Sequence, residues 1–287
     1  MIDSSILKLF LIGSNNEGLR SAVEIGLSST IELINLPATN GFRLRDGLKI
    51  PKKYPLGIIP YSYNQIEFKL IKAPSDSAVK NTALGETEVT QELFEAVMVF
   101  NPSEFKGMSD SLQRPVENVS WFDCIVFCNR LSQGLGLAPY YSLTGIEHAE
   151  YAPQSIKSAT ITELKGNGFR LPTSAEWESF AKACTTNTWS GTNEEKKLGD
   201  YAWFHENSEK QTHPIAQKKP NEWGLYDMIG NVEEWCWDAN TSTSGGRVLR
   251  GGSWVEYASN LRSADSSNGL QGYCYSFLGF RICRSIG

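Results

Sequence analysis

The cysteines and histidines are the residues of this chain that could perform metal or redox chemistry. The cysteines stand at positions 124, 128, 184, 236, 274 and 283. Cys124 and Cys128 lie four residues apart in WFDCIVFCNRL, on what would be the inward face of a helix. We interpret them as buried free thiols, with a disulfide or a metal pair as the alternatives. His148, His205 and His213 show no metal-ligand spacing.

A second group of residues suggests binding rather than catalysis. The stretch VEYASNLRSADSSNGLQGYCYSF, residues 255–277, follows neither the period of a strand nor that of a helix. It lies between two frame segments, RVLRGGSW (247–254) and LGFRICR (278–284). Its Tyr, Ser, Gly and Asn are the residues that antibody paratopes use, because rigid rings supply contact area and small polar groups adapt their hydrogen bonds. The alternative is an ordinary irregular loop with a few packed rings.

Composition limits the classes of function. The chain has 287 residues, of which 40% are hydrophobic and 21% charged, as in a soluble globular protein. A formal net charge of −5 argues against a nucleic-acid partner, because phosphate binding requires a basic face. No apolar run approaches the roughly 18–20 residues of a transmembrane segment. The start, MIDSSILKLFLIGSNNEG, only weakly imitates a signal peptide, so the sequence leaves export open.

The elements that must position these residues fall into two parts. Residues 1–64 contain short alternating runs broken by Pro and Gly, which predicts a β-rich extension or small domain of unknown role. The main domain, residues 65–287, opens with a strand at IEFKLIKAP. Few helices, many loops and eight tryptophans indicate an α+β domain whose loops are held by buried rings.

Three helices carry start signals in this domain. We expect Thr90 to cap the helix in ETEVTQELFEAVM. Ser120, with Asp123 three residues later, should cap the helix in SWFDCIVFCNRLSQ. Thr173 and Glu176 form a capping box in LPTSAEWESFAKAC, a helix that should turn Trp177, Phe180 and Ala181 to the core.

Seven ordered blocks resemble the formylglycine-generating (sulfatase-modifying factor) family. They are GETEVTQELFEAVM, NPSEFKG, RPVENVSWFDCIVFCNRLS, GFRLPTSAEWESFAKA, THPIAQKKPNEWGLYDMIGNVEEWCWD, RVLRGGSW and LGFRICR. The resemblance covers about residues 65–287. It implies the C-type lectin fold of the formylglycine-generating type, with two main helices against a small twisted antiparallel sheet and long ordered loops.

The resemblance also identifies where catalysis would occur. Oxidase members of the family carry two copper-binding cysteines after the GGS turn, at positions that match Glu256 and Leu261 here. Neither can act as a thiolate. Sulfoxide-synthase relatives require an iron site of histidines, which the three histidines do not form. We therefore predict no enzyme activity and neither copper nor iron, with an active or degenerate formylglycine-generating-type oxidase that acts on or binds a peptide as the alternative.

The stretch 255–277 is similar to that of the variable proteins encoded beside diversity-generating retroelements. Their fixed pattern, SW…A…RSA…LGFR, matches Ser253, Trp254, Ala258, Arg262, Ser263, Ala264, Leu278, Gly279, Phe280 and Arg281. Randomised asparagine codons would supply most residues between these points, although Glu256 and Gln271 need another template codon. The resemblance implies a solvent-facing variable surface made of Val255, Glu256, Tyr257, Ser259, Asn260, Asp265, Ser267, Asn268, Gly269, Leu270, Tyr273, Tyr275, Ser276 and Phe277.

The frame, the partner and the location follow from the same interpretation. Arg250, Gly251 and Gly252 should make a tight turn, and LGFRICR should form a strand that places Phe280 and Ile282 inward. A large ring-rich face suits a variable macromolecular ligand, a protein on another cell or on a phage-like particle. The resemblance also implies export to the bacterial cell surface.

One structural metal site is implied by the family's calcium loop, which aligns with DMIGNVEEW. The ligands would be the side chains of Asp227 and Glu234 and the backbone oxygens of Gly230 and Val232, a hard-oxygen set that suits Ca²⁺. The alternative is that Asp227 and Glu234 cap turns and pair with nearby Lys or Arg.

Overall fold

The computed structural model describes residues 57–149, 152–240 and 244–286. The predicted β-rich extension therefore lies almost entirely outside the described residues. By its internal contacts the chain divides into two units, Met1–Pro60 and Tyr61–Gly287.

Three helices begin where the sequence predicts them. They are α3 (Gln91–Met98), α4 (Trp121–Gly134) and α5 (Ser174–Lys182). The Thr90 hydroxyl accepts a hydrogen bond from the backbone N–H of Leu93 at the start of α3. Complete capping boxes precede α4 and α5, so all three predicted caps are confirmed. Short 3₁₀ turns lie at η1 (Ser111–Gln113), η2 (Glu195–Asp200) and η3 (Ala258–Asn260).

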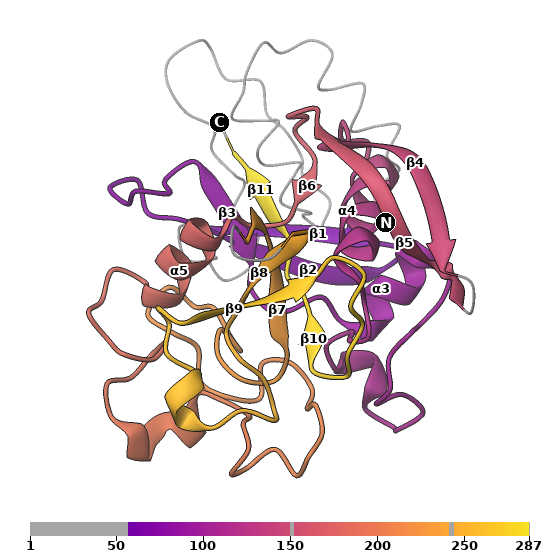
Figure 1. Ribbon diagram of the computed structural model, residues 1–287. Coiled ribbons are helices and arrows are strands. Elements are labelled where there is room, and N and C mark those ends of the chain that lie inside the picture. The colour runs from indigo at the N-terminus through magenta and orange to yellow at the C-terminus, as the bar shows by residue number, and fades with distance from the viewer. Residues whose placement is uncertain (1–56, 150–151, 241–243, 287) are drawn as a thin grey trace, which may run out of the picture. The chain divides into compact units, whose positions relative to one another are not determined.

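The first sheet joins strands from both ends of the domain, as Figure 1 shows. Its order is β1 (Ile58–Tyr63), β2 (Ile66–Lys72), β3 (Thr82–Gly85), β11 (Cys283–Ser285) and β6 (Phe169–Arg170). β11 pairs antiparallel with both β3 and β6. The end of the chain is thus fixed between two strands that come much earlier in the sequence. A separate antiparallel hairpin consists of β4 (Tyr141–Ala149) and β5 (Ala152–Glu163).

The second sheet holds the stretch 255–277. Its order is β10 (Leu278–Gly279), β7 (Glu233–Ala239), β8 (Gly246–Arg250) and β9 (Ser266–Leu270). β10 pairs parallel with β7, whereas the other neighbours are antiparallel. β9 and β10 are therefore the two edge strands, and the residues between them pass from one edge of the sheet to the other.

Two details of the predicted architecture need correction. The sheet is not a single small antiparallel one, because the described residues form three sheets and one of them contains a parallel pair. LGFRICR is not one strand either, because it divides into β10 and β11, which belong to different sheets. Phe280 and Ile282 are nevertheless buried, as expected. The tight turn after β8 is confirmed, with Gly251 and Gly252 both at positive φ, 91° and 65°.

Buried rings hold the loops as well as the core. Phe94 of α3 stacks on Phe127 of α4, and Phe280 packs against both with its ring edge. The indole N–H groups of three tryptophans donate to loop or strand carbonyls: Trp121 to Cys236, Trp189 to Ala258 and Trp235 to Val119. The large aromatic residues thus supply apolar area and also satisfy backbone acceptors. Cys124 and Cys128 are buried free thiols, as the sequence indicated.

Candidate ligand-binding surface

Most of the predicted variable side chains reach solvent. The exposed ones are Tyr257, Ser259, Asn260, Ser267, Asn268, Leu270, Tyr273 and Tyr275, and the half-buried ones are Val255, Glu256, Asp265, Ser276 and Phe277. The fixed positions behave differently. Ser253, Ala258, Ser263, Leu278, Gly279, Phe280 and Arg281 are buried, Trp254 is half-buried, and only Arg262 and Ala264 are exposed. Solvent exposure therefore distinguishes most of the predicted variable positions from most of the fixed positions.

Gly269 departs from this pattern. It is buried in β9, and a Cβ at this position would lie 2.9 Å from Cη2 of Trp235. A larger side chain would have to displace the tryptophan ring, which is fully buried. We therefore remove Gly269 from the predicted surface.

The backbone of the stretch is held by hydrogen bonds to its carbonyl groups. The carbonyls of Glu256, Gln271, Tyr275 and Phe277 accept from the backbone N–H groups of His205, Trp121, Asn118 and Glu233, respectively, at 2.8–3.0 Å. The Trp254 indole donates to the carbonyl of Ser276 as well. Because every residue type has a backbone carbonyl, these contacts do not depend on the side chains they hold in place.

Exposed rings form two groups on the stretch. Tyr275 stacks on Phe277 with ring centroids 5.1 Å apart, and Tyr273 meets Tyr275 edge-on at 5.4 Å. Tyr257 lies over His205, with centroids 4.2 Å apart. Tyr257 is 55% exposed, Tyr273 41% and Tyr275 43%. Rings that are held in position yet remain open to solvent are typical of binding hot spots.

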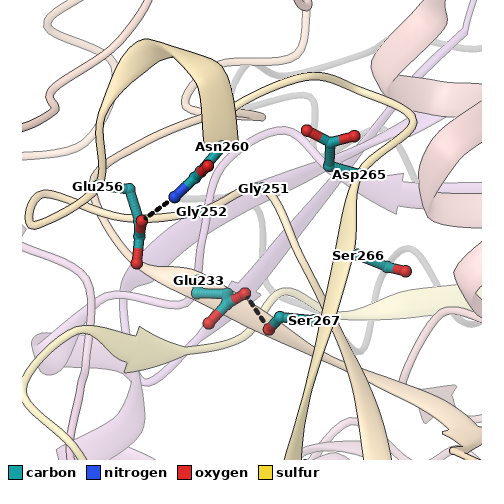
Figure 2. A pocket seen from close by; sticks show the side chains of 8 residues that line it. All are labelled: Glu233, Gly251, Gly252, Glu256, Asn260, Asp265, Ser266 and Ser267. Carbon is teal, nitrogen blue, oxygen red and sulfur yellow. Dashed lines mark hydrogen bonds between the residues drawn. The ribbon is translucent and has the colours of Figure 1, made fainter.

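A cavity of about 310 Å³ lies where the two halves of the stretch meet. Its lining consists of Glu233, Gly251, Gly252, Glu256, Asn260, Asp265, Ser266 and Ser267 (Figure 2). The Glu233 carboxylate accepts a hydrogen bond from the Ser267 hydroxyl at 2.5 Å. Glu256 accepts from the Asn260 amide at 2.6 Å. The cavity thus brings together predicted variable residues from both sides of η3 and a carboxylate of β7.

Glu233 and Ser266 line the cavity but are not among the surface residues predicted from the sequence. The signal was present in the tandem Glu233–Glu234, because neighbouring residues of a strand point to opposite faces of the sheet. Glu233 faces the cavity, whereas Glu234 is buried on the other face. Burial above all, together with the nearby charge of Glu256, raises the pKa of Glu233 to about 7.

The positions that match the oxidase cysteines are occupied by residues of different character. Leu261 is fully buried in an apolar cluster with Trp189, Phe204 and Ile229. Glu256 lies in the cavity described above. His213 stacks on Trp203, and among the described residues no group of three or more His, Cys, Asp or Glu side chains could hold a metal ion.

The two side chains predicted to bind calcium have partners within the protein. Both carboxylate oxygens of Glu234 accept from the guanidinium of Arg281, and one also accepts from the Trp177 indole. The Arg281–Glu234 pair is almost completely buried, so a guanidinium occupies the place where a cation would bind. Asp227 accepts from the Ala216 N–H across a turn. These are the capping and pairing roles of the alternative interpretation, which the contacts favour, although Oδ1 of Asp227 is buried without a hydrogen-bond partner among the described residues. Calcium binding by Asp227, Gly230, Val232 and Glu234 stays a prediction.

Comparisons with known proteins agree with this architecture. The Sulfatase-modifying factor enzyme 1-like domain matches residues 57–286. The solved structure of Treponema denticola variable protein 1 is 36% identical, with a TM-score of 0.69, and the match covers 81% of this chain and 100% of that one. "Chaperone protein LppX" of Paenibacillus barcinonensis is 39% identical over 64% of this chain and 72% of its own length.

The family also contains more distant relatives named after enzymes. "Inactive C-alpha-formylglycine-generating enzyme 2" of Mus musculus is 29% identical over 63% of this chain, which spans about half of that protein (52%). The described residues contain no helix that is long and apolar enough to cross a membrane. The chain belongs to the sulfatase-modifying factor enzyme 1-like family, has its formylglycine-generating-type C-type lectin fold, and resembles the retroelement variable proteins within it.

Proposed function

We propose that this chain is a non-catalytic ligand-binding protein whose residues 255–277 form a changeable surface on a stable C-type lectin scaffold. The observation that carries the proposal is the combination of exposed side chains with main-chain hydrogen bonds in one stretch. A retroelement that rewrites the side chains would leave the backbone contacts in place. The surface consists of the predicted variable residues without Gly269.

The proposed ligand is a protein. Exposed tyrosines spread over the stretch offer contact area for a macromolecule, whereas the cavity, at about 310 Å³, lies at the lower end of the roughly 300–1,000 Å³ of sites for cofactors or drug-sized ligands. The similarity to a protein named a chaperone is consistent with a protein partner. Export to the bacterial cell surface, where such a ligand would be met, belongs to the same proposal.

Selection from a library tests the proposal. The exposed positions among 255–277 would be randomised in the full chain, displayed, and selected against several unrelated proteins. A control library would randomise an equal number of exposed positions far from this stretch in the sequence, such as Glu95, Lys106 and Glu195. We expect specific binders only from the first library. Equal yields from both, or no folded binders from the first, would contradict the proposal.

Absence of catalysis is tested separately. Glu256 and Leu261 replace the two copper-binding thiols, so incubation with copper and a peptide that carries a sulfatase motif should leave the peptide cysteine unchanged. Mass spectrometry of the peptide gives the result. Conversion of its cysteine to formylglycine would establish the oxidase alternative.

A further inference from the structure

Three carboxylates line the cavity between the two halves of the stretch. Glu233 comes from β7 of the scaffold, Glu256 precedes η3, and Asp265 precedes β9. Figure 2 shows Glu256 and Asp265 on opposite sides of the Gly251–Gly252 turn, with Glu233 below it. The remaining lining residues are two serines, an asparagine and two glycines, so no cationic side chain faces this space.

The three carboxylates lack a counter-charge among the described residues. Glu233 uses one oxygen, Oε1, for the Ser267 hydroxyl, and Oε2 has no hydrogen-bond partner in the described ranges. Glu256 uses Oε2 for Asn260. Arg250 of β8 could have supplied a positive charge. Its guanidinium instead pairs with Glu178 and donates to the backbone carbonyls of Ala264 and Asp265.

This arrangement is costly without a ligand. Half-burial of the Glu233 carboxylate removes part of its hydration, and the carboxylate of Glu256 in the same cavity repels it. A bound cation would reverse both effects, because it would neutralise the repulsion and supply donors to the free oxygens. Five of the cavity's eight lining residues, Glu256, Asn260, Asp265, Ser266 and Ser267, belong to the stretch 255–277.

Building on the proposed function, we propose that this cavity binds the cationic end of a basic side chain, lysine or arginine, of the protein ligand. Glu233 is the fixed part of the site, because it belongs to a scaffold strand outside 255–277. Glu256 and Asp265 are changeable parts that adjust the strength of binding. A volume of about 310 Å³, at the lower end of the range for ligand sites, accommodates one lysine or arginine side chain. The scaffold would thus favour basic residues in its ligands whatever the variable residues are.

The test uses the full chain and two small probes. Nα-acetyl-lysine methylamide and its uncharged analogue Nα-acetyl-norleucine methylamide would be titrated while the backbone amide signals of Gly252, Ser266 and Ser267 are followed by NMR. We expect saturable shifts with the lysine probe at a Kd on the order of 1–10 mM and none with the norleucine probe. An arginine probe should behave as the lysine probe does.

Two variants locate the charge that matters. Glu233→Gln keeps the acceptor for Ser267 but removes the charge, and it should weaken lysine binding about tenfold. Glu256→Gln, at a half-buried position, should weaken lysine binding less than Glu233→Gln does. It replaces Glu233→Gln in the test if that variant folds poorly. Glu195→Gln, an exposed position outside the cavity lining, is the matched control and should bind as the parent does.

Equal binding of both probes, no shifts up to about 50 mM, or unchanged binding by both Gln variants would overturn the inference. Such results would leave the library test of the proposed function unaffected.

Discussion

Buried carboxylates in this domain differ in how their charge is balanced. Glu234 is neutralised by Arg281 through several hydrogen bonds. Glu117 is equally buried but pairs with no cation: one oxygen accepts from the Phe105 N–H, and Oε2 has no hydrogen-bond partner among the described residues. Burial consequently raises the pKa of Glu117 to about 7.

The first prediction concerns the pH dependence that Glu117 confers. Because its pKa is higher in the folded than in the unfolded chain, the folded state holds the proton more tightly. The free energy of unfolding should therefore decrease as the pH rises from about 5 to about 7, by about 1–3 kcal/mol for this group. Glu117→Gln should flatten that part of the profile, as measured by urea unfolding at several pH values. An unchanged profile in the variant would show that other groups cause the slope.

The second prediction concerns calcium. Since Arg281 occupies both oxygens of Glu234, addition of calcium or of a chelator should leave the melting temperature of the full chain unchanged. Arg281→Lys should lower the free energy of unfolding by about 3 kcal/mol, because it leaves a buried carboxylate poorly paired. Differential scanning calorimetry measures both. A rise of several degrees in calcium, lost in Asp227→Asn, would restore the family's metal site.

At the scale of elements, the sequence predicted features that depend on neighbouring residues, such as helix caps, but not features that depend on residues far away in the chain, such as strand pairing. The caps at Thr90, Ser120 and Thr173 depend on residues within one helical turn, so the sequence alone predicted them. The division of LGFRICR into β10 and β11 depends on β7, β3 and β6, which lie far away in the sequence. No local pattern in those seven residues reports which strands will be their neighbours.

The candidate site shows the same division. The resemblance to the variable proteins predicted which side chains of 255–277 would reach solvent, because its fixed pattern separates changeable from unchanging positions. Its exception, Gly269, depends on the ring of Trp235 in another strand. The cavity also depends on Glu233, which enters only through the packing of β7 beside β8. Resemblance to the family implies the calcium set, whereas the Arg281–Glu234 pair that disfavours it joins residues 47 positions apart in the sequence.

The third prediction tests the cap of α5. Thr173→Ala removes the hydroxyl that accepts from the Glu176 N–H and should cost about 1 kcal/mol of unfolding free energy. Ser179→Ala in the same helix is the control, because its hydroxyl bonds only to the Ala175 carbonyl of the preceding turn. Urea denaturation compares the two variants. Equal losses would mean that the capping contact contributes little.

At the scale of the whole molecule, the fold separates stability from recognition. Leu261 belongs to an apolar cluster of the core, whereas Tyr257 and Tyr275, close to it in sequence, are exposed. Burial of apolar area stabilises the domain chiefly through residues of the first kind. Side chains of the second kind contribute mainly contact area for a ligand.

The fourth prediction follows from this separation. Replacing Tyr257, Asn268 and Tyr275 together by serine should lower the melting temperature by no more than about 4 °C. Tyr257 and Tyr275 are exposed, so each substitution removes only part of the packing of a ring. Leu261→Ser should lower it by about 10 °C, because it creates a cavity and buries a hydroxyl. Circular dichroism melting curves compare them. Collapse of the triple variant would place the stretch in the core.

The hydrogen bonds to backbone carbonyls have a further consequence for how this protein can change. The carbonyls of Gln271, Tyr275 and Phe277 must reach three separate N–H groups, on Trp121, Asn118 and Glu233, at fixed intervals along the chain. Any residue type can occupy these positions, but one residue more or fewer would put at least one carbonyl out of reach. At these positions the stretch therefore tolerates a change of residue type but not a change of length. A mechanism that diversifies it must exchange bases within codons and never add or remove a codon.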